Sequence, residues 1–463
     1  MIHRWGAERA VRVAVALGAL LAPLNSTMIA VALPDIVGDF DTSIGTVGWL
    51  VTSYLLALAV VQPVAGKLGD RHGRRPFIIG GLAVFGVASL GAALAPSLPF
   101  LIGFRVAQAV SGAVVFPNGA GLIRELIPAD RRGGAFGIVG GSIALAAGLG
   151  PLIGGFLVGV GGWRAIFLVN VPFVAAALAI AWRAVPRSPG VVPETAFDWL
   201  GATLLAAVLG GSAALVVESA HAPAALAPGI PVLLVLAAVF VRRELRHPDP
   251  VFQPRFFTIR PFAAANAGIS SSNLAFYTVL LATPLLLTRH LQWSSLQIGI
   301  ALALLLAPMV AFSPIGGRLA DRYGRRLPSV AGCAMLVAGL LPLALAPGLG
   351  TSALLPCLCL MGAGVGLSTA GLQASAIEAL EPAQAGVAAG LFSTSRYVGS
   401  FAGSIALARL LDEGHGLSGF HAVFVIALVG AIISVLVTLA LPTGSARGPG
   451  KPWAAVPDAP PRF

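Results

Sequence analysis

Apolar residues occur along this chain in blocks of roughly 20, and short segments between the blocks carry most of the charges. A helix rises about 1.5 Å per residue, so roughly 20 apolar residues cross the hydrocarbon core of a bilayer, which is about 30 Å thick. The pattern therefore predicts an all-α polytopic membrane protein with fourteen transmembrane helices. The expected spans are residues 13–33, 47–65, 77–95, 100–122, 135–158, 165–182, 199–217, 224–241, 262–287, 298–316, 329–346, 353–372, 386–408 and 422–441.

The composition excludes an ordinary soluble protein. Of the 463 residues, 57% are hydrophobic and only 10% are charged, whereas soluble domains average about 25% charged residues. The net charge of +11 could indicate nucleic-acid binding, but the basic residues lie in the loops between spans, so we expect no nucleic-acid partner. The three cysteines lie inside apolar blocks without metal-ligand spacing, and we expect neither a metal nor a cofactor.

The positions of the basic residues set the expected orientation. With the N-terminus in the cytoplasm, the loops and tails on that side hold 24 of the 29 lysines and arginines, as the positive-inside rule requires. An even number of spans then puts both termini in the cytoplasm. We expect a monomeric multi-pass protein of a bacterial cytoplasmic (inner) membrane, in contact with membrane lipid.

An internal repeat divides the chain. Residues 66–75 read GKLGDRHGRR and residues 317–326 read GRLADRYGRR, with an offset of 251 residues. Duplication of a six-span bundle explains the match, and such repeats build many secondary transporters. We expect an N-terminal six-helix bundle at 1–186, linker helices seven and eight at 187–260, a C-terminal six-helix bundle at 261–441 and a disordered cytoplasmic tail at 442–463.

The repeated loop resembles the signature of the major facilitator superfamily, and other motifs are similar to those of its fourteen-span drug/proton antiporter branch. These motifs include Leu24-Asn25-Ser26-Thr27 in span one, Arg105, Gln108, Gly112 and Pro117 in span four, and Gly150-Pro151 with Gly154-Gly155 in span five. Asn25 stands where the family usually has aspartate, and Ala109 and Ala146 stand where glycines are usual. The resemblance implies the major facilitator fold and alternating access.

The resemblance also implies that the two repeated loops act as gates. The candidate residues are Gly66, Asp70, Arg71, Gly73, Arg74, Gly317, Asp321, Arg322, Gly324 and Arg325. Asp70 can cap a helix N-terminus or pair with arginines. We interpret it as a latch between spans two and eleven that holds one face closed. The alternative is a topology anchor only, although topology alone would not need the aspartate.

Gly150, Pro151, Gly154 and Gly155 predict a kink in span five. Pro151 removes a hydrogen bond from the helical ladder, and the glycines permit close helix packing. The family resemblance links this kink to export. The alternative is ordinary helix packing, because glycine and proline are frequent in membrane helices.

Polar residues at span depth predict a water-accessible cavity for substrate and proton. The candidates are Asn25, Arg105, Gln108, Asn118, Asn266, Asn273, Tyr277 and Arg396. Arg105 either faces this cavity or snorkels to the outer interface. No carboxylate lies at mid-membrane depth in the sequence. A cavity with two arginines and no acid would prefer neutral or anionic substrates over quaternary ammonium compounds.

Together these features predict a secondary active transporter that exports hydrophobic small molecules, driven by an ion gradient with the proton as coupling ion. A metabolite uniporter or importer of the same fold is the alternative. A membrane-embedded lipid-handling protein or enzyme would be a different class. The chain has no HExxH, GxSxG or nucleotide P-loop motif, so we do not expect an enzyme.

Overall fold

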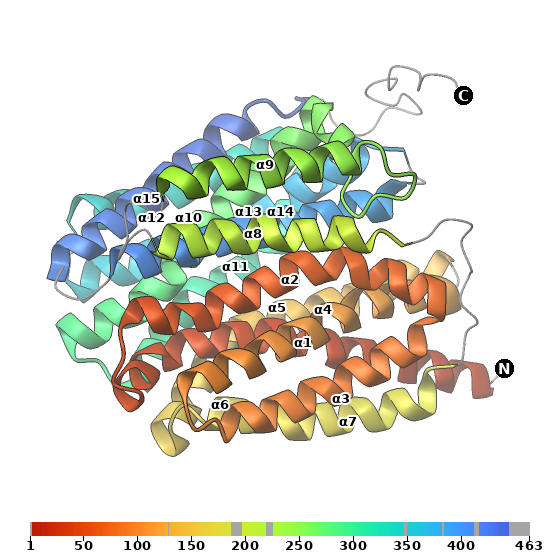
Figure 1. Ribbon diagram of the computed structural model, residues 1–463, viewed down its shortest axis with the longest axis horizontal. Coiled ribbons are helices and arrows are strands. Elements are labelled where there is room, and N and C mark those ends of the chain that lie inside the picture. Colours follow the sequence, from red (N-terminus) through yellow and green to blue (C-terminus); the bar gives the residue numbers. More distant parts are fainter. Residues whose placement is uncertain are drawn as a thin grey trace.

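Every element that the structure describes is a helix (Figure 1). The structure is a computed structural model and describes residues 2–127, 129–186, 197–218, 226–346, 350–381, 384–411 and 416–443, so most of the expected tail at 442–463 lies outside the described residues. The helices are α1 (Ile2–Asp39), α2 (Ile44–His72), α3 (Arg74–Ala93), α4 (Leu98–Leu126), α5 (Ala129–Gly161), α6 (Ala165–Leu168), α7 (Asn170–Ala184), α8 (Trp199–Glu218), α9 (Leu226–Glu244), the 3₁₀ helix η2 (Pro254–Thr258), α10 (Arg260–Leu291), α11 (Ser295–Tyr323), α12 (Arg326–Leu345), α13 (Thr351–Glu378), α14 (Ala385–Leu410) and α15 (Gly416–Thr438).

The helices confirm the predicted fold class. The one-turn α6 continues almost directly into α7, and together they form the sixth span, so the described chain has fourteen long helical segments. Thirteen of them are long and apolar enough to cross a membrane. The remaining segment is α14, which carries the polar run Ser393–Arg396 near its centre.

The repeated loops are largely helical, because the helices extend beyond the apolar blocks. α2 continues to His72, so the first half of the loop motif forms its last turns. The chain then turns at Gly73, whose φ of 85° favours glycine, and the second repeat turns at Gly324 with φ 87°. A side chain would strain the backbone at either position, which explains glycine at both.

Two helices begin with side-chain caps at the end of the molecule opposite the termini. Ser43 accepts a hydrogen bond from the backbone N–H of Thr46 at 3.2 Å where α2 begins. Ser294 and Gln297 form a reciprocal capping box where α11 begins. These caps satisfy backbone donors that would otherwise lack partners. The two serines are separated by the repeat offset, so the internal symmetry extends to the caps.

The first six spans and the last six spans pack mainly among themselves. In the first set, α1 packs against α4, α5 and α7, while α4 packs against α2 and α3. In the second set, α10 packs against α13, α14 and α15, while α13 packs against α11 and α12. The two halves meet along two seams, α2 with α14 and α5 with α11, and α1 touches α10 between them.

The α2–α14 seam makes close contacts at the end opposite the termini. A Cβ added to Gly48 would lie 3.1 Å from the Cβ of Ala408. One turn further along, the hydroxyl groups of Thr52 and Ser404 are 3.0 Å apart in a buried hydrogen bond. These residues lie in the part of each helix that is remote from the chain termini, so the seam is closed at that end.

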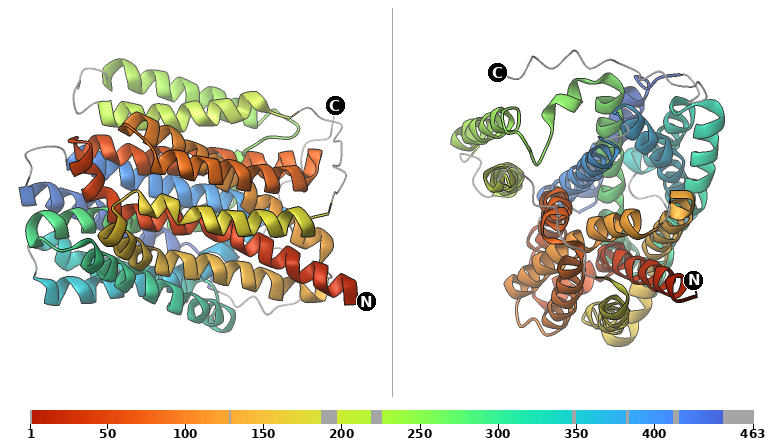
Figure 2. Two further views of the ribbon diagram at one scale, coloured as in Figure 1. Left: turned by 90° about the horizontal axis from the view of Figure 1, so that it is seen from below. Right: turned by 90° about the vertical axis from the view of Figure 1, so that its right-hand side faces the viewer.

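The inserted hairpin of α8 and α9 lies on the outside of the molecule (Figure 2). α8 packs against α9 and also against α2 and α14, so it backs one of the two seams. α9 leaves apolar side chains such as Val232, Leu234 and Val235 exposed. An apolar surface of this kind is unusual against water and suits contact with lipid.

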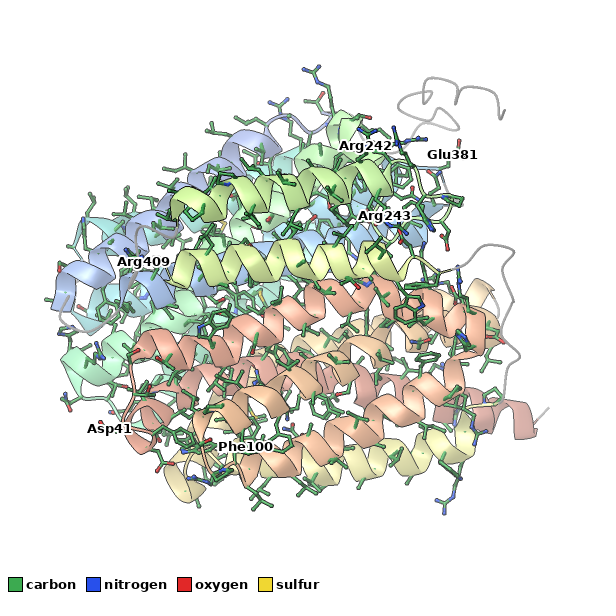
Figure 3. The ribbon with its side chains drawn as sticks, in the orientation of Figure 1. Asp41, Phe100, Arg242, Arg243, Glu381 and Arg409 are labelled. Atoms are coloured by element: carbon green, nitrogen blue, oxygen red, sulfur yellow. The ribbon has the colours of Figure 1, made fainter. Side chains whose placement is uncertain are left out.

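Charged side chains mark the two ends of the helices. Figure 3 shows Arg242, Arg243 and Glu381 at the end that holds both termini in Figure 1, and Asp41 and Arg409 at the other end. The perimeter between these ends exposes large apolar side chains, including Phe156, Leu345 and Leu436. This distribution is what a bilayer requires of a bundle that spans it.

We expect the two repeated loops to face the cytoplasm. In a variant without the three native cysteines, which are all free, Arg74→Cys and Arg325→Cys should each resist an impermeant thiol reagent added outside intact cells. Asp41→Cys, at the opposite end of the molecule, is the matched control and should be labelled. Labelling of position 74 or 325 from outside would contradict the N-inside orientation.

Candidate functional site

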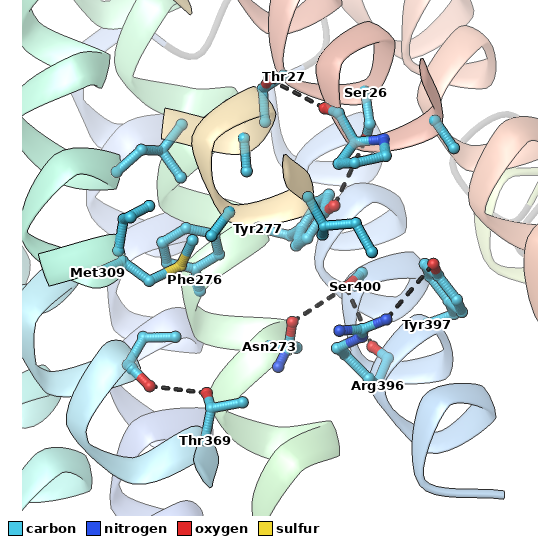
Figure 4. Close-up of a pocket in the computed structure, with 18 of the residues that line it drawn as sticks. Ser26, Thr27, Asn273, Phe276, Tyr277, Met309, Thr369, Arg396, Tyr397 and Ser400 are labelled. Carbon is cyan, nitrogen blue, oxygen red and sulfur yellow. Dashed lines mark hydrogen bonds between the residues drawn. The ribbon is translucent and has the colours of Figure 1, made fainter. Parts of the chain in front are cut away.

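A cavity of about 260 Å³ lies between the two halves of the molecule (Figure 4). α1, α2, α4 and α5 line it from the first half, and α10, α11, α13 and α14 line it from the second. On α2, α4, α5, α11 and α13 the lining positions run from the middle of the helix toward the end that carries the termini, and on α1, α10 and α14 they lie around the middle. The closed seam and the cavity therefore occupy opposite parts of the interface between the halves.

Most of the cavity wall is apolar. The large apolar lining residues are Leu58, Phe116, Ile143, Phe276, Leu280, Leu306, Met309, Val310 and Val365. The polar lining residues are Ser26, Thr27, Gln62, Asn273, Tyr277, Ser313, Thr369, Arg396, Tyr397 and Ser400. Apolar walls with a few convergent polar groups are typical of sites that bind small molecules.

The polar groups gather where α1, α10 and α14 face one another. The hydroxyl groups of Ser26 and Tyr277 are 3.4 Å apart, and these residues hold equivalent positions in the two repeats because they are 251 residues apart. Ser400 donates a hydrogen bond to Oδ1 of Asn273 at 3.5 Å. The pseudo-twofold axis that relates the two repeats therefore passes between Ser26 and Tyr277, where the equivalent helices α1 and α10 meet at the cavity.

Arg396 is the one formally charged residue among those that the structure shows lining the cavity. Its Nη2 donates to the hydroxyl oxygen of Tyr397 at 3.5 Å, and its guanidinium lies 5.0 Å from the centroid of the same ring. Figure 4 shows Arg396 beside Asn273 and Ser400. The hydroxyl and the ring of Tyr397 carry no charge. The described lining residues include no aspartate or glutamate, so none of them balances the charge of Arg396.

The cavity contains only part of the predicted set of residues. Asn273, Tyr277 and Arg396 line it. The other five are at most 1% exposed and lie in contacts between helices, which corrects the expectation that they face the cavity: Asn25, Arg105, Gln108, Asn118 and Asn266. Buried polar groups in a low-dielectric interior are stabilised by hydrogen bonds, and each of these five residues makes at least one to the protein, although Nδ2 of Asn25, Nη2 of Arg105 and Oδ1 of Asn118 have no partner among the described residues.

Arg105 is completely buried among neutral partners. Its Nη1 donates to Oδ1 of Asn25 and, at 3.1 Å, to Oε1 of Gln108. Its guanidinium lies 4.1 Å from the centroid of the Tyr54 ring, a cation–π geometry. Arg105 thus neither faces the cavity nor reaches the outer interface, because a buried amide and aromatic cluster holds it.

Asn118 and Asn266 connect neighbouring helices. Nδ2 of Asn118 donates to the backbone oxygen of Ala65 on α2 at 3.1 Å. Oδ1 of Asn266 accepts a hydrogen bond from the hydroxyl of Ser395 on α14 at 2.9 Å. Interhelical hydrogen bonds of this kind stabilise membrane bundles, so these residues act in packing.

Seven polar lining residues were not predicted from the sequence: Ser26, Thr27, Gln62, Ser313, Thr369, Tyr397 and Ser400. Ser26 and Thr27 directly follow Asn25 in α1. Successive residues of a helix are rotated by about 100°, so these two can line the cavity while Asn25 points away from it. One signal was available. Asn273 with Tyr277, and Arg396 with Ser400, are each four residues apart and so share a helix face.

The glycines of α5 lie in close helix contacts. α5 continues unbroken through Pro151. A Cβ on Gly150 or Gly154 would collide with α1, and a Cβ on Gly155 would lie 2.5 Å from the backbone oxygen of Ser295 on α11. The glycines therefore permit the close approach that forms the α5–α11 seam.

The two aspartates of the repeated loops form local ion pairs. Asp70 pairs with Arg74, and Asp321 pairs with Arg325 at 2.6 Å, each across the glycine turn between two successive helices. Arg325 also binds Glu378 on α13 through two hydrogen bonds of 2.6 and 3.1 Å. The hydrogen bond to Glu378, followed by the one to Asp321, raises the pKa of the Arg325 guanidinium above its usual value.

The expected latch between spans two and eleven is not made in this structure. The ion pair of Asp70 stays within its own loop, and the helix of the second half that packs along α2 is α14 rather than α12. A latch at the terminus-bearing end would have to form in another conformation, because here the halves make their close contacts at the opposite end.

An ion cluster fastens the linker to the first half. Lys67 and Arg71 both bind the carboxylate of Asp249, Arg71 at 3.0 Å. Burial raises the pKa of the Asp249 carboxyl, but the two cations outweigh this effect and hold the pKa below its usual value. Because the pKa is lowered in the folded state, this stabilisation is present above a pH of about 4 and is lost as the pH falls further.

The internal repeat, the apolar helices and the central cavity define a membrane transporter. The chain belongs to the Major Facilitator Superfamily, whose family model matches residues 15–403 and 265–459.

Relatives with known names span most of the chain. It is 37% identical over 435 residues to the uncharacterized MFS-type transporter YvkA of Bacillus subtilis, covering 94% of this chain and 96% of that protein. It is 32% identical over 412 residues to the tetracenomycin C resistance and export protein of Streptomyces glaucescens, covering 87% and 76%. It is 32% identical over 409 residues to a multidrug resistance protein B homolog of Mycobacterium tuberculosis, covering 85% and 74%.

Solved structures share the fold. A crystal structure of a D-xylose–proton symporter matches with a TM-score of 0.68 at 16% identity, covering 94% of this chain and 98% of that chain. A bacterial homolog of the human lysosomal transporter Spinster, in an inward-facing and unoccupied conformation, matches with the same TM-score, identity and coverage. Similarity at this level of identity concerns the fold alone.

Replacing Asn25 with aspartate should stabilise the protein. Oδ1 of Asn25 already accepts a hydrogen bond from Arg105, so Asn25→Asp gives a buried cation an ionic partner in the same position. We expect the free energy of unfolding to rise by about 1–3 kcal/mol, because a buried charge without an ionic partner costs several kcal/mol and the new carboxylate balances it. Thermal unfolding of the detergent-solubilised protein measures the change.

Asn118→Asp is the matched control for that experiment. The Asn118 amide donates to the backbone oxygens of Ala65 and Val114, which would repel a carboxylate, so this variant should unfold at a lower temperature. A higher unfolding temperature for both variants, or for neither, would contradict the pairing of residue 25 with Arg105.

Gly155→Leu should force the closed seam apart, because an added Cβ would meet the backbone of α11. In a background without native cysteines, Ser404→Cys is buried in the other seam and should react slowly with a water-soluble thiol reagent. Gly155→Leu should speed that reaction severalfold. Gly159→Leu is the matched control, since nothing lies within 4 Å of a Cβ at Gly159. Equal rates in the two variants would show that the seam does not depend on Gly155.

Proposed function

We propose that this protein is a secondary active exporter of hydrophobic small molecules that works by alternating access. The observation that carries the proposal is the largely apolar cavity between two repeats whose seams are closed at one end. Burial of apolar area contributes roughly 25 cal/mol per Å², so shape and area would hold such a substrate more than directional bonds. Relatives named for multidrug resistance and for tetracenomycin C export support the export direction.

In the proposed orientation, the end with both termini faces the cytoplasm of a bacterium. The cavity then lies on the cytoplasmic side, and the structure is an inward-facing state that takes substrate from the cytoplasm or the inner leaflet. Export requires the α2–α14 and α5–α11 seams to part and the cytoplasmic end to close. Two halves that rock about a central site are the usual basis of such a cycle.

The repeated loops lie where the cytoplasmic gate would close. We infer that Asp70 and Asp321 exchange their local partners, Arg74 and Arg325, for contacts across the gate in the outward-facing state. The glycines of α5 serve the opposite gate, since they let α5 and α11 approach closely. The link between these glycines, with Pro151, and export direction rests on the family resemblance.

We also propose that the protein belongs to the fourteen-span drug/proton antiporter branch and acts as a monomer in the inner membrane. The fourteen long helical segments and the peripheral hairpin of α8 and α9 support that assignment. The proton is the coupling ion in this proposal, and the membrane supplies the gradient.

Export can be tested in a bacterial strain that lacks its own exporters. With a panel of neutral, anionic and cationic fluorescent compounds, cells that make the protein should accumulate less of at least one compound than cells with an empty vector. An uncoupler should remove the difference, and respiration should drive uptake into inverted vesicles without ATP. Gly155→Leu is the inactive control.

Each other outcome assigns a different function. Greater accumulation in cells that make the protein would indicate an importer. Equilibration that an uncoupler does not alter would indicate a uniporter. An absence of any difference across the panel would overturn export of hydrophobic compounds.

A further inference from the structure

Arg396 introduces a positive charge into a cavity whose other described lining residues are uncharged. Its side-chain contacts in the described structure are the hydroxyl and the ring of Tyr397. The hydrogen bond of 3.5 Å is long for its type. A guanidinium has five N–H donors, so most of its donors have no protein partner in the described residues.

Arg105 provides a comparison, because it is an arginine at membrane depth whose contacts are all with the protein. Arg105 is fully buried, binds two amide oxygens and lies over the Tyr54 ring, and only its Nη2 has no hydrogen-bond partner among the described residues. Arg396 is partly exposed to the cavity and lies near the centre of α14. A charge at that depth is costly without a partner, so the cavity is the place where a partner would be supplied.

Neutral hydrogen-bonding groups surround this charge. Asn273 lies beside Arg396 in Figure 4, and its Nδ2 uses one hydrogen in a bond of 3.0 Å to the backbone oxygen of Ile269. The Tyr277 hydroxyl also lines the cavity. These groups can orient the oxygens of an acid that pairs with the guanidinium, while the apolar walls accept the rest of the molecule.

We propose that the cavity binds hydrophobic organic anions, with the carboxylate or sulfonate group of the substrate on the guanidinium of Arg396. The planar guanidinium matches the two oxygens of such a group with parallel N–H···O hydrogen bonds. The apolar body of the substrate then lies against α5, α11 and α13, which supply Ile143, Met309 and Val365. This inference rests on the proposed export function and names its substrate class.

Two dyes with one ring system test the proposal. Anilinonaphthalenesulfonate is an anion, and N-phenylnaphthylamine is its neutral counterpart without the sulfonate. Purified protein in lipid nanodiscs should bind the anionic dye more tightly after subtraction of the signal from empty nanodiscs. Arg396→Gln should weaken binding of the anion by about 10- to 100-fold, the range for a hydrogen bond to a charged group. Binding of the neutral dye should change by less than about twofold.

Three further measurements keep the test independent of folding. Arg396→Lys should retain part of the affinity for the anion, because it keeps the charge but not the planar fork. Arg409→Gln, on the same helix at the far end of the molecule, should bind both dyes as the wild type does. In the wild type, dodecanoate should displace the anionic dye and its methyl ester should not, which requires no variant at all.

Two outcomes would overturn the substrate class. Unchanged binding of the anionic dye in Arg396→Gln is one, and equal displacement by dodecanoate and its ester is the other. Export of neutral or cationic compounds in cells, with either of these results, would leave the proposed function intact. Tight anion binding through Arg396 without any export would instead overturn the proposed export function, while the anion-binding site at Arg396 would still stand.

Discussion

The close approach of α5 and α11 is the contact on which the rest of the structure depends. A Cβ on Gly299 would lie 2.5 Å from the carbonyl oxygen of Pro151, so backbone meets backbone there. Lipid offers little hydrophobic force to drive helices together, and van der Waals contact between small residues replaces it. Because the halves are joined tightly at this end, the space between them is left toward the other end.

A second rule sorts the polar residues that lie at membrane depth. Each polar group in a low-dielectric interior needs a partner, and that partner comes from the protein or from whatever fills the cavity. Arg105 obtains its partners from Asn25, Gln108 and Tyr54, so it is a structural residue. Arg396 has only Tyr397 in the described residues and faces open space. The same residue type therefore has two roles, decided by its surroundings.

The sequence was sufficient for the fold because apolar block length and the repeat offset are physical quantities that can be read along a chain. The turns at Gly73 and Gly324 were not predicted, although a glycine repeated at the same place in both loops is the signal that a positive φ leaves in a sequence. The sequence was insufficient for the cavity, since polarity and depth do not reveal which helix face a residue occupies. Asn25 was expected in the cavity, and its neighbour Ser26 lies there instead.

The contacts of the repeated loops could not be predicted for a different reason. In the proposed cycle the partner of Asp70 depends on which end of the molecule is closed, and a sequence does not specify one conformation of a two-state protein. In this state Asp70 pairs within its own loop, while Arg71 of the same motif binds Asp249 and secures the linker. One short motif thus holds the linker in place and, in the proposed cycle, would also serve as a gate.

A fixed charge at the centre of α14 has an electrical consequence. In an alternating-access cycle most of the membrane potential falls across whichever end is closed, so Arg396 is at the cytoplasmic potential in one state and at the external potential in the other. In the proposed cycle a bound monovalent anion would neutralise the site, and the loaded protein would then change state without moving net charge. In the proposed antiport cycle the protein would return without substrate and with the coupling proton, and an inside-negative potential would pull the positive charges of Arg396 and the proton inward by up to about 2.3 kcal/mol per charge per 100 mV. The voltage would thus act on the return of the proton-loaded carrier, not on the passage of the substrate.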